Sequence, residues 1–313
     1  MRMAVIGSGG VGGYFGAMLH AAGEEVVFTA RGEHMRAMQK EGLRVATPEG
    51  TLLVPPGSCT GPDGDLRDPE AVLFCVKSYD TAQAAAALFS RLREGTAVVS
   101  LQNGVENEEL IQRALPHCAV LGGVAYIYST ITRPGEITVG AGPRRIVFAP
   151  RGDGAARIRT QAERLLEVCR GARINAEIPA DITAELWKKF IFITGAGGLT
   201  ALTRLTLAEI LAVDATRGLL ADVMRETLAV ARARGVAVPD DFMEGVFATL
   251  GRFDNATRSS LYYDLVNGKP MELEALPGTV MRLGARLGVP TPVNRVIYAA
   301  LLPYHIHNTE KRR

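Results

Sequence analysis

The sequence has little that would point to a metal centre, a membrane span or a highly charged partner. Its 313 residues include only four cysteines, which are scattered and lack the spacing of metal ligands. The 35 basic and 33 acidic residues nearly cancel, so no nucleic-acid surface is expected. No apolar stretch is long enough to span a bilayer, and no signal peptide is visible. We therefore expect a cytoplasmic protein that binds neither nucleic acid nor a membrane.

The length and the pattern of apolar residues predict two domains. Hydrophobic residues make up 47% of the chain, and 313 residues suffice for two hydrophobic cores. In residues 1–179, short apolar strands alternate with helical segments, which predicts a doubly wound parallel sheet. In residues 180–313, apolar residues recur at three- and four-residue spacing, which predicts a mostly helical domain. The predicted fold class is α/β, with an N-terminal Rossmann-like domain followed by a second, mostly helical C-terminal domain.

Several local elements can be placed within this outline. We expect a buried strand at Ala71–Val76, a helix at Thr81–Arg91 and a second buried strand at Ala97–Leu101. The stretch Gly57–Pro69 is rich in Gly, Pro and Asp, which predicts a loop. The alternating residues of Gly135–Phe148 predict an antiparallel hairpin at the sheet edge. Further expected elements are a helix at Ala155–Arg170, a strand at Ala172–Ile178 and a helix at Ile182–Ile193.

A Gly-x-Gly-x-x-Gly motif follows the apolar strand Met3–Ile6 and precedes the helical run Tyr14–Ala22. Gly7 would permit a tight turn, Gly9 would let the backbone approach a pyrophosphate, and Gly12 would let the helix pack closely on the strand. In this context the motif predicts dinucleotide binding rather than a merely structural strand–helix turn. No Gly-Lys-Ser/Thr follows, so a nucleoside-triphosphate loop is not expected. The expected cofactor contacts here are Gly7, Ser8, Gly9, Gly10, Val11 and Gly12.

The end of the next strand, Glu25–Thr29, bears on the choice of dinucleotide. Enzymes that use NAD usually place a carboxylate there for the ribose hydroxyls, yet this chain has none until Glu33. It has Arg31 instead, whose guanidinium could clamp a 2′-phosphate with charge-assisted hydrogen bonds. An ordinary solvated arginine is the alternative. We favour the phosphate clamp, and hence NADP(H) rather than NAD(H).

Two more polar residues follow predicted strands of the sheet. Lys77 comes after Ala71–Val76, and Asn103 comes after Ala97–Leu101. Ligands bind at the carboxyl ends of the strands in open α/β sheets, so both residues are candidates for cofactor or substrate contacts. Taken singly, Lys77 could be solvated and Asn103-Gly104 could be a simple turn.

The helical half contains two adjacent lysines beside its only tryptophan. On a helix, Lys188 and Lys189 point about 100° apart. Phe190 and Ile193 indicate that the neighbouring face is buried, which would bring Lys189 towards a cleft. A lysine in a partly apolar pocket has a lowered pKa and can act as a general acid. Two solvated lysines remain the alternative for this pair taken alone.

Two acidic residues further along alternate with apolar ones. Glu272 and Glu274 lie on opposite sides of Leu273, so one of them would face inward and the other outward. The spacing does not decide between them.

These motifs together resemble the ketopantoate reductase (2-dehydropantoate 2-reductase) family over nearly the whole chain. The residues that carry the resemblance are the N-terminal glycine motif, Val76-Lys77, Gln102-Asn103-Gly104, Glu185-Leu186-Trp187-Lys188-Lys189, Ser259-Ser260 and Glu272-Leu273-Glu274. The resemblance implies NADPH-dependent reduction of ketopantoate, a small 2-oxo acid, to pantoate in pantothenate biosynthesis.

The resemblance also implies roles for individual residues. Lys189 would donate the proton to the substrate ketone, and Ser260 would bind the substrate carboxylate. Asn103 would contact both cofactor and substrate, and Glu272 would lie near the nicotinamide ribose. Lys77 and Arg31 would complete the NADP site.

The sequence departs from the family pattern at two substrate positions. The family helix usually carries asparagine four and eight residues after the lysine, where this chain has Ile193 and Gly197. Losing such a hydrogen-bonding group can be worth ~1–3 kcal/mol, so a reductase of the same fold for another 2-oxo acid is an alternative. Thr194 or Thr200 could compensate. A non-catalytic NADP(H)-binding sensor is a second alternative, and a homodimer stays open.

Overall fold

The structure is a computed structural model that describes residues 1–151, 158–250 and 255–311. The chain forms two compact units, of which the first comprises Met1–Gln102 and Glu106–Glu185. The second comprises Asn103–Val105 and Leu186–Arg313. Apart from the short excursion at Asn103–Val105, the chain passes from the first unit to the second within one helix, α6 (Ile182–Thr203), a few residues beyond the expected boundary at residues 179 and 180.

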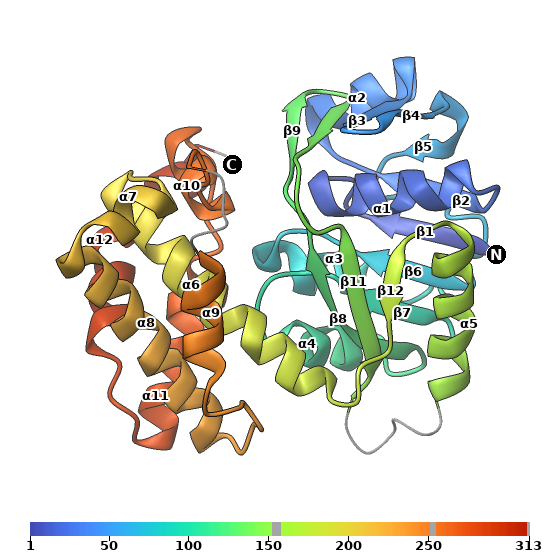
Figure 1. Cartoon of the computed structure of the whole chain (residues 1–313). Coiled ribbons are helices and arrows are strands. Elements are labelled where there is room, and N and C mark those ends of the chain that lie inside the picture. Colours follow the sequence, from blue (N-terminus) through green and yellow to red (C-terminus); the bar gives the residue numbers. More distant parts are fainter. Residues whose placement is uncertain (152–157, 251–254, 312–313) are drawn as a thin grey trace. The chain divides into compact units, whose positions relative to one another are not determined.

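The described part of the first unit contains a main sheet of eight strands in the order β12-β11-β8-β7-β6-β1-β2-β5 (Figure 1). Neighbouring strands are parallel except β8 and β11, which are antiparallel. These strands are β1 (Arg2–Ile6), β2 (Glu25–Thr29), β5 (Cys59–Thr60), β6 (Ala71–Phe74), β7 (Ala97–Ser100), β8 (Ala119–Tyr126), β11 (Arg145–Pro150) and β12 (Asn175–Glu177). The chain winds outward from β1 in both directions, which confirms the predicted Rossmann-like fold class.

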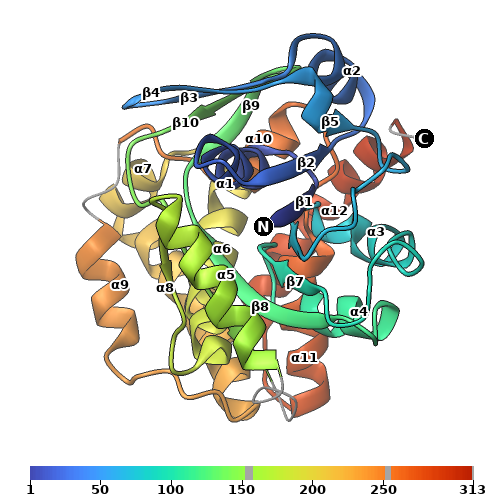
Figure 2. The ribbon, with the colours of Figure 1, turned by 90° about the vertical axis from the view of Figure 1, so that its right-hand side faces the viewer.

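Helices cover both faces of this sheet, and Figure 2 shows α1 (Gly10–Ala21) and α5 (Arg159–Gly171) on one side, with α3 (Thr81–Ala86) and α4 (Asn107–Ala114) on the other. Successive residues of a strand point to opposite faces. Val5 therefore packs in one core with Phe15 and Leu165, whereas Ile6 packs in the other with Ile111. Helix α2 (Gly32–Glu41) and two short 3₁₀ turns, η1 (Pro56–Ser58) and η2 (Ser78–Asp80), complete the helical elements described in this unit.

The predicted hairpin at Gly135–Phe148 is wrong, because its two strands belong to different sheets. β10 (Glu136–Val139) pairs antiparallel with β9 (Ser129–Arg133) and parallel with β3 (Leu43–Thr47). With β4 (Gly50–Val54), these strands form a second, four-stranded sheet in the order β4-β3-β10-β9. β11 instead lies between β8 and β12 in the main sheet. Both predicted strands exist, but β10 pairs with the preceding strand β9 and with β3, while β11 pairs with β8 and β12.

Several predicted bounds also differ from the structure. The helix expected at Thr81–Arg91 ends at Ala86, and three-residue turns follow, with Leu88 N–H bonded to Ala85 O at 3.0 Å. Part of the loop expected at Gly57–Pro69 forms β5 at the sheet edge. The last strand spans only Asn175–Glu177. The helix expected from Ala155 begins at Arg159, and residues 155–157 lie outside the described residues.

The second unit is helical in its described residues. Its long helix α6 continues ten residues beyond the expected end at Ile193, to Thr203. A Cβ at Gly195 would lie 2.7 Å from Met224, and one at Gly198 would lie 3.0 Å from Ile297, so these glycines let two helices approach α6 closely. The other elements are α7 (Leu207–Ala212), α8 (Asp214–Ala233), α9 (Phe242–Leu250), α10 (Ser260–Val266), the π-helical turn η4 (Glu274–Gly278), α11 (Thr279–Leu287) and α12 (Pro292–Glu310).

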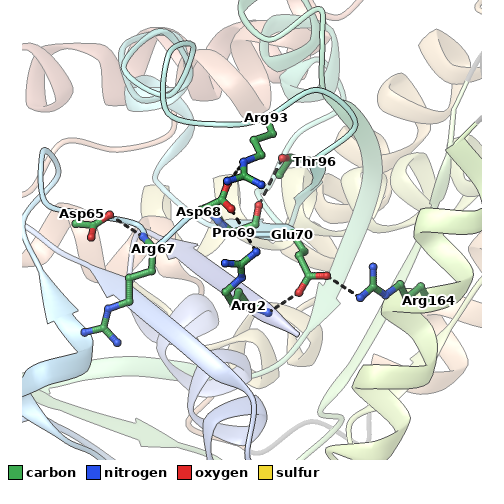
Figure 3. A network of polar contacts seen from close by, with 9 residues as sticks. All are labelled: Arg2, Asp65, Arg67, Asp68, Pro69, Glu70, Arg93, Thr96 and Arg164. Carbon is green, nitrogen blue, oxygen red and sulfur yellow. Dashed lines mark hydrogen bonds and ion pairs between the residues drawn. The ribbon is translucent and has the colours of Figure 1, made fainter.

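The amino-terminal edge of the main sheet carries a network of ion pairs (Figure 3). Asp68 accepts from Arg93 at 2.5 Å and pairs with Arg2 at 3.2 Å. Glu70 accepts from the backbone of Arg2 at 2.9 Å and from the guanidinium of Arg164 at 2.6 Å. A groove of about 330 Å³ lies here, but carboxylates of the same cluster balance its arginines, so we interpret the network as structural. Among the described residues, no helix is both long and apolar enough to cross a membrane.

Candidate active site

The glycine loop has the close packing that the motif predicts. Gly7 has a φ of +96°, and a Cβ there would lie 2.8 Å from the backbone nitrogen of Val76. A Cβ at Gly12 would lie 2.4 Å from Gly7 O, so only glycine lets α1 pack this tightly on β1. A Cβ at Gly9 would meet nothing within 4 Å. The loop is therefore tightly packed at Gly7 and Gly12 and open at Gly9, as the approach of a ligand to the backbone requires.

Two buried hydroxyl groups lie at this loop without partners among the described residues. They are Ser8 Oγ and Ser129 Oγ, and Ser8 is 1% exposed. A Cβ at Gly10 would lie 2.7 Å from Ser129 Oγ, which places this hydroxyl beside the start of α1. Buried polar groups are normally hydrogen-bonded, so these two hydroxyls are candidates for contacts with a polar ligand. Sequence reasoning missed Ser129, because it comes from β9 and no local motif marks it.

A histidine that the sequence reasoning did not single out holds the same loop. His34 Nε2 lies 2.9 Å from Ser8 O, and the backbone N–H of Gly135 donates to His34 Nδ1 at 3.0 Å. These contacts require the neutral imidazole, with its proton on Nε2. Burial lowers the pKa of His34, although the hydrogen bond to Ser8 acts in the opposite direction.

Arg31 and Lys77 lie at the carboxyl ends of β2 and β6, the two strands that flank β1 in the sheet. Arg31 directly precedes α2, and its Nη1 lies 3.4 Å from Oδ2 of Asp80. Lys77 is half-buried and directly precedes η2. The structure thus brings Arg31, Lys77 and the glycine loop together at adjacent strand ends, and it adds Asp80, which the sequence reasoning did not identify.

A buried amide connects the ends of β6 and β7. Gln102 is 5% exposed, and its Nε2 donates to Val76 O at 2.9 Å and to Thr81 Oγ1 at 2.7 Å. Gln102 therefore fixes the chain on both sides of Lys77 and immediately before Asn103. Gln102 belongs to the Gln102-Asn103-Gly104 motif that resembles the family, but the sequence did not predict its contacts.

In the second unit, α6 places Lys189 one residue before the fully buried Phe190. Burial lowers the pKa of Lys189 to about 8, and the Glu272 carboxylate acts in the opposite direction. An amine with this pKa is mostly protonated at pH 7 and can still give up its proton readily, as a general acid requires. The neighbouring Lys188 instead lines a surface groove beside α9, together with Phe242.

Glu272 faces inward, at 5% exposed, while Glu274 is exposed. Glu272 lies just before the π-helical turn η4, and its backbone carbonyl accepts from the N–H of Leu276 at 3.1 Å. Its Oε2 lies 3.5 Å from the side-chain nitrogen of Asn103. Asn103 belongs to the second unit by its contacts, so this unit alone brings Asn103, Lys189 and Glu272 into one cluster.

The two serines before and within α10 have different environments. Ser259 precedes the helix and accepts from Tyr262 N–H at 3.1 Å, and its Oγ lies 2.7 Å from Thr200 Oγ1. Ser260 is the exposed first residue of the helix. Ser259 and Thr200 thus tie α10 to α6, while Ser260 faces solvent.

The two positions that depart from the family pattern lie on α6. Ile193 is half-buried, and the room beside Gly197 is apolar, since a Cβ there would lie 4.0 Å from both Leu261 and Leu276. Thr200 donates to Ala196 O at 2.7 Å, so its hydroxyl is engaged within the protein. Thr194 is 1% exposed, and its hydroxyl has no partner among the described residues.

Comparisons with known proteins show the family to which the chain belongs. The family model described as "Ketopantoate reductase PanE/ApbA" matches residues 3–153, and the model described as "Ketopantoate reductase PanE/ApbA C terminal" matches residues 181–305. The chain is 30% identical over 300 residues to the 2-dehydropantoate 2-reductase of Halobacterium salinarum, covering 95% of this chain and 96% of that protein.

Solved structures share the fold. The crystal structure of a PanE/ApbA family ketopantoate reductase from Ralstonia eutropha JMP134 has a TM-score of 0.87 and 32% identity, covering 99% of this chain and 100% of that one. The ternary structure of D-mandelate dehydrogenase with NADH and anilino(oxo)acetate has a TM-score of 0.90 over 99% of both chains. Its identity of 20% shows a common fold alone.

Proposed function

The chain belongs to the ketopantoate reductase family of oxidoreductases, and we propose that it reduces ketopantoate to pantoate with NADPH. The observation that supports this most strongly is the cluster of Lys189, Glu272 and Asn103. It places a lysine with a pKa of about 8 beside a buried carboxylate and an amide. We assign cofactor binding to residues 1–179 and substrate binding and catalysis to residues 180–313.

The fit of a dinucleotide is supported by the space at Gly9 and the unpartnered hydroxyl of Ser8. The glycine loop, residues 7–12, would hold the pyrophosphate, and Lys77 would bind nearby. Arg31 would bind the 2′-phosphate, which is the reason to propose NADP(H) rather than NAD(H). A bound nicotinamide supplies a hydride to the substrate's carbonyl carbon.

The protein's own contribution is to position the substrate and provide a proton. Lys189 donates its proton to the carbonyl oxygen as that oxygen gains negative charge. Glu272 favours the protonated form of Lys189 beforehand, because its carboxylate stabilises the ammonium. Asn103 holds the cofactor and the substrate through its side-chain amide, next to Glu272. Ser260 binds the substrate carboxylate through its hydroxyl.

A second candidate is a reductase of the same fold that acts on a less polar 2-oxo acid. It is supported by Ile193 and by the apolar surroundings of Gly197. The unpartnered hydroxyl of buried Thr194 is the polar group that could offset this loss for ketopantoate.

The test is oxidation of NADPH by the purified protein, measured against a panel of 2-oxo acids. The proposal expects ketopantoate to give the highest kcat/KM, and a less polar 2-oxo acid would do so under the second candidate. Tight NADPH binding without turnover of any member would contradict both and favour a non-catalytic NADP(H) sensor.

A further inference from the structure

Arg31, the proposed phosphate ligand, already has an anionic neighbour. Its Nη1 lies 3.4 Å from Oδ2 of Asp80, and the two side chains are 42% and 16% exposed. The contact is longer than the 2.7–2.9 Å of a strong charge-assisted hydrogen bond. A partly exposed pair of this kind anchors an arginine only weakly.

The sheet topology places this ion pair at the cofactor loop. Arg31 follows β2 and Asp80 follows β6, and these strands lie on either side of β1. Neighbouring strands are about 4.8 Å apart, so β2 and β6 are separated by roughly 10 Å. The side chains of Arg31 and Asp80 span this separation at the end of β1. The glycine loop leaves β1 at this point. The Arg31–Asp80 pair therefore lies where a dinucleotide's adenosine half binds in an open α/β sheet.

We propose that Asp80 determines cofactor specificity by opposing the 2′-phosphate that Arg31 attracts. This inference rests on the proposed NADPH-dependent function and deepens it. Asp80 weakens the preference for NADPH over NADH that Arg31 alone would give, so the chain binds the two cofactors with more similar affinity.

Electrostatics supports this direction. A phosphate on Arg31 carries up to two negative charges, and it lies within a few ångströms of the Asp80 carboxylate. The phosphate must compete with Asp80 for the guanidinium of Arg31, and the Asp80 carboxylate also repels it. NADH carries a hydroxyl group in that place, and this hydroxyl can donate a hydrogen bond to a carboxylate. The Asp80 charge therefore acts against NADPH and not against NADH.

The test is Asp80→Asn in the full chain, with the dissociation constants of NADPH and NADH measured by calorimetry. Asparagine keeps an oxygen acceptor for Arg31 and removes the charge. We expect NADPH binding to tighten about tenfold, and NADH binding to change less than about twofold. The tightening should shrink as salt is added, because the repulsion is partly screened.

A matched control is Glu163→Gln. Glu163 pairs with Arg159 at 2.9 Å on the exposed face of α5, so this change removes one negative charge far from the strand ends. It should leave both affinities unchanged. Adenosine 2′,5′-bisphosphate and adenosine 5′-monophosphate serve as further probes, because they isolate the adenosine half from the nicotinamide.

Two results would overturn the inference while leaving the proposed function in place. One is NADPH binding that weakens in Asp80→Asn, which would mean that Asp80 preorganises Arg31. The other is an unchanged ratio of the two affinities, with retained NADH binding showing that the variant is folded. A wild-type protein that binds neither cofactor would instead contradict the proposed function itself.

Discussion

The side-chain nitrogen of Asn103 lies 3.5 Å from Oε2 of Glu272, although 169 residues separate the two in the chain. The carboxylate of Glu272 also raises the pKa of Lys189 against the larger effect of burial. One buried carboxylate thus adjoins both the amide proposed to hold the ligands and the amine proposed to supply the proton. Its charge therefore affects the protonation of Lys189 as well as the arrangement of the site.

The first prediction concerns Glu272→Gln and the pH profile. Activity requires protonated Lys189, so kcat/KM of the wild type should fall above a pH of about 8. The Glu272 charge raises the pKa of Lys189, so Glu272→Gln should lower this pKa. The decrease in kcat/KM should then occur at a lower pH than in the wild type. Glu274→Gln is the matched control, because Glu274 is exposed. If kcat/KM of Glu272→Gln decreased at the same pH as that of the wild type, Glu272 would not affect the pKa of Lys189.

The second prediction concerns Gln102→Met, which keeps the length of the side chain but removes its donor. The variant loses the bonds to the half-buried Val76 O and to the buried Thr81 Oγ1. The free energy of unfolding should fall by ~1–3 kcal/mol, and KM for the cofactor should rise. Gln112→Met on the exposed face of α4 is the control, measured by the same urea denaturation. Equal stability of the two variants would refute the positioning role.

Local patterns in the sequence predicted much of this site. The close packing of the glycine loop and the strand ends that carry Arg31 and Lys77 follow from neighbouring residues. The sequence also places Lys189 beside the buried Phe190, but Lys188 and Lys189 are both half-buried, so their exposure does not distinguish them. The inward orientation of Glu272 did not follow, because the chain leaves strand-like alternation for the π-helical turn η4.

Contacts between distant segments could not be predicted in this way. Asp80 meets Arg31 because β2 and β6 both lie beside β1, and Ser129 meets the start of α1 because β9 packs against that helix. The predicted hairpin at Gly135–Phe148 is wrong because β10 pairs with β9 just before it and with β3 from about 90 residues earlier, and not with β11. A pattern of alternating residues identifies a strand but not its partner.

The third prediction concerns the substrate. A site that hydrogen-bonds a hydroxyl rejects the analogue lacking it by about 10⁴–10⁵, whereas an apolar pocket reaches only ~10². With Ile193 and Gly197 in place of asparagines, kcat/KM for ketopantoate over its deoxy analogue should lie nearer the lower figure. Ile193→Asn should raise this ratio, and Thr194→Val should lower it if the Thr194 hydroxyl contacts the substrate. A wild-type ratio near 10⁴ would contradict the expectation.

The fourth prediction concerns His34 and stability at low pH. Because burial lowers the pKa of His34 in the folded protein, its neutral form is favoured there. Its contribution to stability is fully present above the ordinary histidine pKa of about 6.5 and is lost as the pH falls through the lowered value. Thermal unfolding at pH 7 and pH 5 should therefore show a smaller pH effect in His34→Leu than in the wild type. His307→Leu, at an exposed position of α12, should retain the full effect.

The central claim is that Lys189 supplies the proton in the reduction of ketopantoate, and the most direct measurement is kcat for Lys189→Ala and Lys188→Ala beside the wild type. The two lysines are adjacent, but Lys189 alone is placed in the cluster with Glu272. We predict that Lys189→Ala lowers kcat by roughly 10²–10⁴-fold, the usual contribution of general acid catalysis, with NADPH affinity retained. Lys188→Ala should remain close to the wild type. Equal effects of the two substitutions, or a larger loss in Lys188→Ala, would contradict the account.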